Sequence, residues 1–169
     1  MTVRFNNNWK GLTEVMKEPD VRNAVLDDAT EIVMEKQGYD MSLLSVLPGT
    51  KVVEVEHEGK VLGYFVLTPH KTLRHVYDVH TLLSKECRGI RALNVAEMGL
   101  DLVFNGLDCE ILRSQCPDTN KASLLFALRM GFKPMTKEKD WMKNGVLYES
   151  THVSLTREHW EERRQLKCH

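Results

Sequence analysis

The sequence predicts a single α+β domain in which helices cover a mixed β-sheet. Apolar residues recur at helical spacing near the start, β-branched and aromatic runs follow, and strand-like and helix-like segments then alternate. A strand-helix-strand segment set among hairpins requires both parallel and antiparallel neighbours in one sheet. With 169 residues, 42% of them hydrophobic, the chain can bury one sizeable core but is too short for two ordinary domains. We therefore expect one domain over residues 1–169.

The first half of the chain is expected to supply helices and then three strands. The first forty-odd residues are polar with apolar positions near helical spacing, which predicts one or two helices before Pro48-Gly49. Residues 50–56 and 60–69 are β-rich runs, and the His57-Glu58-Gly59 turn between them predicts a hairpin. Residues 72–84 predict a third strand.

The second half alternates helix and strand. A helix is expected up to Asn105-Gly106 because Leu93, Ala96, Leu100, Val103 and Phe104 form one apolar stripe. A short strand at 109–115 follows, and it should run parallel to the strand that ends near residue 84 through a right-handed crossover. The next helix is capped within residues 118–120 and ended by Gly131.

The tail of the chain predicts a hairpin and a last helix. A charged stretch leads to a turn at Asn144-Gly145 and a final strand over 145–156. From Arg157 on, the sequence predicts a polar, frayed helix.

Charge and apolar content exclude several classes of partner. The 23 basic and 24 acidic residues nearly cancel, so no global field favours nucleic acid or an anionic membrane. No apolar run is long enough to span a bilayer, and the amino terminus lacks the apolar core of a secretion signal. We expect a cytoplasmic protein.

The cysteines and histidines do not predict a metal site or a disulfide framework. The spacing of His70, His75 and His80 is odd, so along a strand His75 points away from the other two. The four cysteines lack a C-x-x-C pair and are interpreted as buried reduced thiols: Cys87, Cys109, Cys116 and Cys168.

Two motifs carry functional chemistry. In "VHTLLSKECRGIRALNVAEMGL", an apolar strand runs into an Arg-Gly turn that opens a helix. The unpaired backbone N–H groups at a helix start can hold a diphosphate, although solvated arginines in an ordinary turn explain the residues as well. In the second motif, Asn120 precedes Gly131-Phe132 by eleven residues, the length of one capped three-turn helix. Asn120 can be a helix cap or a contact for a ligand.

These motifs, with the interior glycine of residues 60–69 and the final hairpin, resemble the GCN5-related N-acetyltransferase (GNAT) superfamily. The resemblance is strongest over residues 50–156, and residues 157–169 are a tail or helix outside it. It implies the acyl-CoA N-acyltransferase fold, acetyl-CoA as co-substrate, and direct acetyl transfer to a small-molecule or protein amine.

The resemblance also implies which residues bind the cofactor. The strand segment 81–83 would hold the pantetheine, and the turn at 88–92 would hold the diphosphate. The start of the helix capped within residues 118–120 would contact the pantetheine arm. The residues are Thr81, Leu82, Leu83, Arg88, Gly89, Ile90, Arg91, Ala92, Asn120 and Ser123. The chain departs from the family pattern at Arg91 and Leu93, where small residues belong, and at Ala127, where a proton-donating tyrosine often stands.

The candidate catalytic bases are Asp78 and His80. They stand two residues apart on a strand and therefore on one face, where either can take the proton from the amine. Exposure on a solvent face is the simpler alternative. Glu86 is a weaker candidate base, and a Cys116–His80 nucleophile pair lacks any accompanying oxyanion feature.

Two functions are compatible with these residues. The first is an acetyl-CoA-dependent N-acetyltransferase acting on an unidentified amine. The second is a catalytically degenerate relative that serves as a binding or assembly component, of the kind found in tailed-phage virions. A homodimer or an assembly partner remains open in both.

Overall fold

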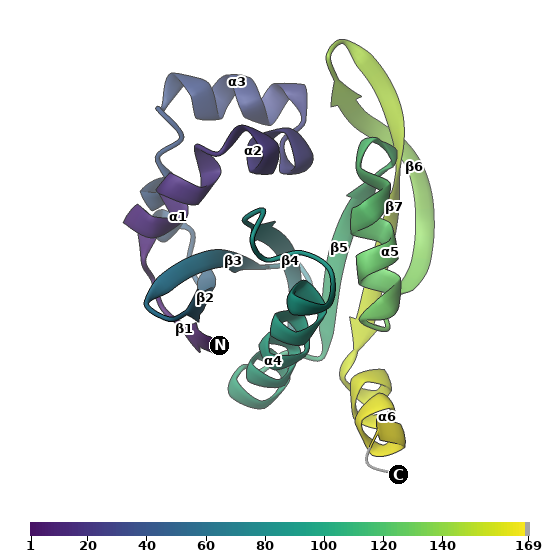
Figure 1. Ribbon diagram of the computed structural model, residues 1–169. Helices are drawn as coiled ribbons and strands as arrows, with labels where there is room; N and C mark the ends of the chain where they lie inside the picture. Colours follow the sequence, from purple (N-terminus) through teal and green to yellow (C-terminus); the bar gives the residue numbers. More distant parts are fainter. Residues whose placement is uncertain (168–169) are drawn as a thin grey trace.

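Seven strands form one mixed sheet in the computed structural model, which describes residues 1–167 (Figure 1). The strand order is β1-β2-β3-β4-β5-β7-β6, and all neighbours are antiparallel except β4 and β5. The parallel β4–β5 pair confirms the predicted parallel pairing of these strands. The strands are β1 (Thr2–Phe5), β2 (Lys51–His57), β3 (Lys60–Pro69), β4 (Val76–Leu83), β5 (Ile111–Pro117), β6 (Lys133–Lys143) and β7 (Val146–Thr156).

Helices lie on both faces of this sheet. The α-helices are α1 (Trp9–Met16), α2 (Pro19–Val25), α3 (Asp28–Lys36), α4 (Ile90–Gly106), α5 (Lys121–Arg129) and α6 (Arg157–Lys167). Two short 3-10 helices are η1 (Met41–Val46) and η2 (Asp118–Asn120). No helix within residues 1–167 is both long and apolar enough to cross a membrane.

The amino-terminal region differs most from the prediction. The structure has three α-helices there instead of one or two, and β1 was not expected at all. β1 pairs with β2, and its end is held by the carboxylate of Glu54, which is 2% exposed. Asn6 Nδ2 and Asn8 Nδ2 each donate to that carboxylate at 2.9 Å. A strand this short and polar has no sequence signal of its own, because its pairing depends on a residue almost fifty positions away.

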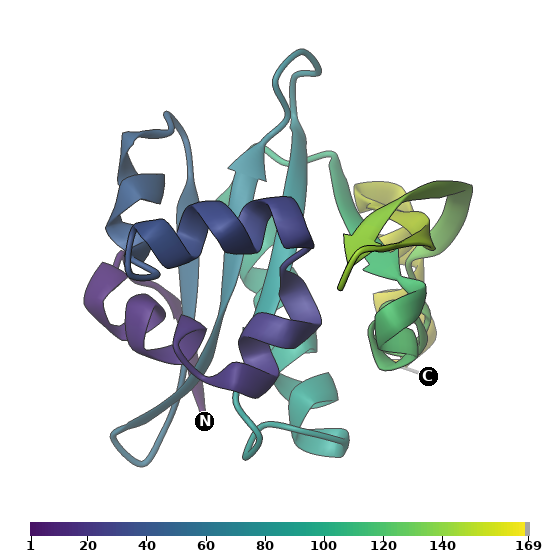
Figure 2. The same cartoon turned by 90° about the horizontal axis from the view of Figure 1, so that it is seen from above.

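Two cores form, one on each face. One packs α4 against β3, β4 and β5, with Phe65, Leu83, Val95 and Phe104 among its buried residues. The other packs the amino-terminal helices against the opposite face, which carries Tyr64, Val66 and Leu82. Figure 1 shows α4 below the sheet and α1–α3 above it, and Figure 2 shows α3 lying across the strands.

The last helix is anchored, so the prediction that it is frayed was wrong. Trp160 is 2% exposed, and its ring stacks on that of Phe104 with centroids 5.0 Å apart. Arg157 Nη2 donates to Cys109 O at 2.7 Å, and Arg163 Nη1 donates to Met130 O. These arginines satisfy carbonyls just beyond α4 and α5, groups that a helix end leaves unpaired.

The tip of the β6–β7 hairpin docks on the amino-terminal helices (Figure 1). Lys143 Nζ donates to Leu26 O at 2.9 Å and to Glu31 Oε2 at 3.0 Å. The backbone N–H groups of Asn144 and Gly145 donate to the carboxylate of Asp28, each at 2.8 Å. The β6–β7 hairpin is thereby tied to the amino-terminal helices that cover one face of the sheet.

Candidate functional site

The parallel pair β4–β5 is short, and the two strands part beyond it. They pair only from Val76–Ile111 to Asp78–Arg113. Just past this point Ser114 Oγ donates to Val79 O at 3.2 Å, the last link between the strands that the described residues provide. A cavity of about 660 Å³ occupies the split and reaches both faces of the sheet. This volume lies within the range of about 300–1,000 Å³ that is usual for small-molecule sites.

The split leaves part of the β4 backbone without a partner strand. Ser84 N donates to Leu62 O at 2.9 Å, which shows that the even-numbered positions here direct their backbone groups toward β3. Adjacent residues of a strand direct theirs to opposite sides, so the N–H and C=O groups of Thr81 and Leu83 face β5, where no pairing follows Asp78 within residues 1–167. Thr81, Leu82 and Leu83 all line the cavity.

The Arg-Gly turn opens the first turn of α4 into the same cavity. Gly89 is the N-cap, with φ 60° and ψ −134°, and no side chain caps the helix there. A Cβ added at Gly89 would meet nothing within 4 Å, so the space in front of the turn is open. Unpaired amides at the start of a helix attract anions. The turn is therefore accessible to a charged ligand.

The arginines of this turn lie apart from each other. Arg91 Nη1 donates back to Glu86 O at 3.1 Å, and its side chain does not line the cavity. The turn is thus not filled by Arg91, the position where the family pattern has a small residue. Ile90 is 78% exposed and also lies outside the lining, whereas Arg88, Gly89 and Ala92 belong to it.

Asn120 and Ser123 lie on the opposite wall of the cavity. Asn120 Oδ1 accepts from Ser123 N at 3.3 Å, so Asn120 is the helix cap that one interpretation expected. Both residues also line the cavity, and the cap does not exclude a ligand contact. Ala127 is buried on the same helix, which leaves no ionisable group at this position.

His80 and Asp78 face the side of the sheet that the amino-terminal helices cover, because they alternate with residues on the α4 side. His80 lies two residues beyond the last β4–β5 pair and lines the cavity. His80 is exposed to the solvent space of the hollow, in line with the solvent-face alternative. Protein atoms around the hollow still desolvate the ring, which lowers the pKa of His80, partly opposed by the charge of Asp78. His80 is therefore neutral near pH 7. Asp78 does not line the cavity, and its carboxylate lies 3.6 Å from Arg113 Nε.

The buried cysteines are poor nucleophiles. Burial raises the pKa of the Cys116 thiol, and it raises the pKa of Cys109 to about 11. The thiolate is the reactive form, so both thiols stay protonated at neutral pH. No hydrogen bond joins Cys116 to His80 within residues 1–167, although both line the cavity.

Several residues of the cavity carried no sequence signal for a site. Arg129, at the end of α5, lines the cavity, and Gln115 lies at the split. The side of the cavity toward the amino-terminal helices is lined by apolar residues of α1, α2, α3 and η1 and by Trp141 of β6. The helical spacing of these apolar residues indicated a core, and only the tertiary arrangement shows that some of them face a hollow.

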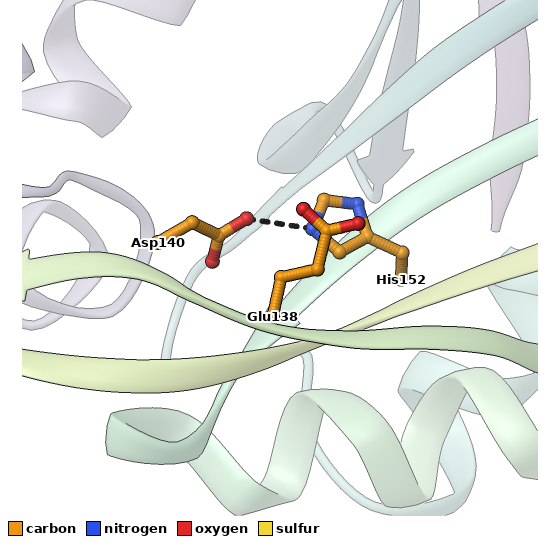
Figure 3. Close-up of side chains that lie close together, drawn as sticks. All are labelled: Glu138, Asp140 and His152. Atoms are coloured by element: carbon orange, nitrogen blue, oxygen red, sulfur yellow. Dashed lines mark hydrogen bonds and ion pairs between the residues drawn. The ribbon is translucent and has the colours of Figure 1, made fainter.

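A polar cluster lies on β6 and β7 (Figure 3), and its His152 pairs with Gln115 of β5 in the sheet. Within the described residues Glu138, Asp140 and His152 are the one group whose ligand atoms could hold a metal ion. His152 Nε2 lies 2.7 Å from Asp140 Oδ2, and Ser150 Oγ donates to Asp140 Oδ1 at 2.5 Å. Burial would raise the pKa of Asp140, but these bonds lower it overall. Hydrogen bonds thus tie Asp140 to His152 and Ser150.

Comparisons with known proteins show that solved structures share this fold, although sequence comparisons find no match. No protein-family model matches the chain, and no curated protein matches its sequence. Among solved structures, the yncA protein of Salmonella typhimurium, with its cofactor acetyl-CoA, has a TM-score of 0.71 at 16% identity over 93% of this chain and 94% of that chain. The ribosomal-protein-alanine N-acetyltransferase of Brucella melitensis has a TM-score of 0.66 at 17% identity, covering 92% and 99% of the two chains.

A third structure carries two bound molecules. The spermidine N-acetyltransferase of Vibrio cholerae, in complex with CoA and spermine, has a TM-score of 0.73 at 12% identity, covering 95% of this chain and 97% of that chain. At these identities the likeness shows the fold alone, and it confirms the fold that the sequence predicted.

Proposed function

We propose that this chain, which has the fold of the GCN5-related N-acetyltransferases, is an acetyl-CoA-dependent N-acetyltransferase. The observation that supports the proposal is one continuous cavity that joins the open Gly89 turn, the unpaired edge of β4 and the ring of His80. An anion site, a hydrogen-bonding edge and a neutral base in one hollow are what a thioester and an amine need in order to meet.

The cofactor would lie along the side of the cavity that faces α4 and α5. The diphosphate would bind the N–H groups at the start of α4, where the helix dipole contributes about half a positive charge. Arg88 and Arg129 line the cavity and would add charge. The pantetheine amides would pair with the N–H and C=O groups of Thr81 and Leu83. Two structural neighbours hold acetyl-CoA or CoA, which supports acetyl-CoA as the co-substrate.

His80 would act as the general base. The protonated amine loses one proton to become a nucleophile, its nitrogen attacks the thioester carbonyl carbon, and the C–S bond breaks as the thiolate leaves. The nitrogen loses a second proton and the thiolate gains one, so one proton is released overall. A neutral imidazole where β4 and β5 part can take the proton from the amine. Asp78 would act through His80, because its charge raises the pKa of that ring.

The absence of an acid at position 127 does not exclude catalysis. General acid catalysis contributes about 10²–10⁴ in rate, whereas positioning two reactants contributes effective molarities of about 10⁵–10⁸ M. Positioning is the larger effect, and the cavity provides it.

The test is the His80→Asn variant. We expect kcat/KM for acetyl transfer to fall by about 10²–10⁴ because the base is lost, while acetyl-CoA affinity is unchanged. The ratio of wild-type to variant rate should decline only below pH 6.5, because the pKa of His80 lies below that ordinary value. A variant that keeps the wild-type rate and pH profile would remove His80 from the mechanism.

The second candidate function, a non-catalytic binding or assembly component, is favoured by the buried Ala127. A thermal-shift titration with acetyl-CoA separates the two. A ligand at a hundred times its Kd stabilises the fold by about 2.7 kcal/mol. If millimolar acetyl-CoA produces no shift, the acetyltransferase proposal fails.

A further inference from the structure

The cavity has a second arm that runs from His80 between the sheet and the amino-terminal helices. Apart from Asp27 and Thr30, its described lining over α2, α3, η1 and β6 is apolar, including Val21, Val25, Leu26, Met34, Met41 and Trp141. Trp141 is 8% exposed and brings a large aromatic ring to this arm. Two thioethers near an aromatic ring give a surface that adapts to apolar groups of different shapes.

The arm holds little negative charge for a cationic substrate. Asp27 is the only carboxylate in the described lining, and its Oδ1 already accepts from Thr30 N at 2.8 Å. The nearby carboxylates Asp28 and Glu31 are occupied by the hairpin tip. A polyamine in this arm would have to bury several ammonium groups with one acidic partner, and an unpaired buried charge is strongly unfavourable.

The β6–β7 hairpin reaches the arm through Trp141. Lys143 Nζ bonds to Leu26 O and to Glu31, and Trp141 stands two residues earlier on the same strand. The docking of the tip therefore sets Trp141 against α2 and α3. An acceptor in this arm would be surrounded by apolar groups, with its amine pointing toward His80 at the split.

We infer that the acceptor is a primary amine carried on an apolar body, such as an aromatic or branched aliphatic group, and that polyamines are excluded. The inference rests on the proposed function and names the substrate class of that site. A free arylalkyl amine and a peptide whose amino-terminal residue has a large apolar side chain share this chemistry.

The first experiment measures kcat/KM with acetyl-CoA for n-alkylamines from propylamine to heptylamine, for phenethylamine and for spermidine. Each buried methylene should raise kcat/KM about threefold to fourfold until the arm is full. Spermidine should be no better than butylamine. A flat series, or a preference for spermidine, would overturn the inference. Tripeptide amides that begin with Phe or with Asp show whether the acceptor is a free amine or a peptide. Only a peptide acceptor makes the Phe peptide a better substrate than phenethylamine.

A matched pair of variants tests the arm itself. Thr30 and Ala29 both lie exposed in the first turn of α3, but only Thr30 lines the cavity. Thr30→Asp and Ala29→Asp add the same charge at a helix start, where an acid is tolerated. Thr30→Asp should lower the ratio of heptylamine to 1,7-diaminoheptane turnover about tenfold, and Ala29→Asp should leave the ratio unchanged. Equal ratios in both variants would contradict the inference.

A binding measurement keeps the inference testable if no amine is acetylated. Tryptophan fluorescence and thermal shift with heptylamine alone report occupancy of the arm, with Trp141→Phe as the optical control. Binding that Thr30→Asp weakens and Ala29→Asp does not would support the inference, and absence of binding would overturn it. The acetyl-CoA thermal shift reports separately on the proposed function.

Discussion

Gly89 holds φ at 60° at the start of α4, in the left-handed region that favours glycine. A side chain there would strain the turn that presents the backbone amides, although the space in front of it is open. The sequence predicted this turn from the Arg-Gly pair but did not show where Arg91 would point. Its position outside the cavity depends on the carbonyl of Glu86, a local contact that spacing rules do not encode.

Gly89→Ala is therefore expected to weaken acetyl-CoA binding by about tenfold or more, equivalent to about 1.4 kcal/mol. Gly38 is a matched control, because it also has a positive φ, 62°, and open space around its Cβ position. Both variants should lose stability on the order of 1–3 kcal/mol through backbone strain. Isothermal titration with acetyl-CoA separates them, and an equal Kd for both would show that the turn is not the diphosphate site.

His80 illustrates how far residue types alone lead. Its alternation with Asp78 predicted that both would share a face, and the register agrees, since they pair with Val66 and Thr68 of β3. The sequence did not show which of these two side chains lines the cavity. It is decided by where β4 and β5 part, two residues before His80.

At the scale of elements, β3 and β4 approach closely at Gly63, near a register shift in β2 at Val55 and Glu56. A Cβ at Gly63 would lie 2.3 Å from Leu82 O and 2.8 Å from Leu83 Cα, both backbone atoms that cannot rotate away. This glycine therefore permits the position of the β4 segment that is proposed to bind pantetheine.

Gly63→Ala should destabilise the protein by about 1–3 kcal/mol or more, because the two strands must move apart. It should also weaken acetyl-CoA binding. Gly59→Ala serves as the control, because Gly59 lies in the turn between β2 and β3 and a Cβ there would meet nothing within 4 Å. Its cost should be about 1 kcal/mol, with cofactor affinity retained. Urea unfolding and titration measure both effects, and similar losses in the two variants would contradict the close-approach argument.

The start of α1 depends on a side chain with two roles. Asn8 Oδ1 accepts from Gly11 N at 2.9 Å, and Asn8 Nδ2 donates to the buried Glu54 at 2.9 Å. Burial would raise the pKa of Glu54. Hydrogen bonds from the side chains of Asn8, Asn6, Arg4 and Tyr64 nevertheless lower this pKa overall. The carboxylate is thus kept charged inside the protein.

Asn8→Ala should cost about 2–3 kcal/mol, because it removes a helix cap and one hydrogen bond to a charged group. Asn7 is exposed and makes no side-chain hydrogen bond within residues 1–167, so Asn7→Ala should change stability by less than about 0.5 kcal/mol. The comparison is made by urea unfolding at pH 7. If both variants unfold at the same urea concentration, Asn8 does not hold the α1–β2 junction.

At the scale of the whole molecule, the amino-terminal helices and the β6–β7 hairpin meet where the hairpin tip docks on α3. Hydrogen bonds from the backbone N–H of Gly145 and then of Asn144 lower the pKa of Asp28 below its ordinary value of 3.8. A carboxyl with a lowered pKa contributes stability that is present above the ordinary pKa and lost as pH falls through the folded value.

Asp28→Asn should therefore be less stable than the wild type at pH 7, and this difference should shrink as the pH falls below 3.8. The matched control is Asp27→Asn, which changes the neighbouring carboxyl without touching the hairpin tip. Thermal unfolding across this pH range measures the effect. A difference between Asp28→Asn and the wild type that is independent of pH would show that the docking does not depend on the charge. In the amine series, loss of this docking should raise KM for the acceptor and leave KM for acetyl-CoA unchanged.

The sequence by itself determined the fold class, most strands, the helix that follows the Arg-Gly turn and the capped helix at Asn120, because these depend on periodicity and turn residues within short windows. It did not reveal β1, the anchoring of α6 or the docking of the hairpin tip. Those features rest on contacts between residues from 33 to over a hundred positions apart, such as Arg163 with Met130 and Lys143 with Glu31. Only the tertiary structure decided which apolar residues pack in a core and which line the arm of the cavity, because the same helical spacing serves both, and the difference is whether a neighbouring element fills the space.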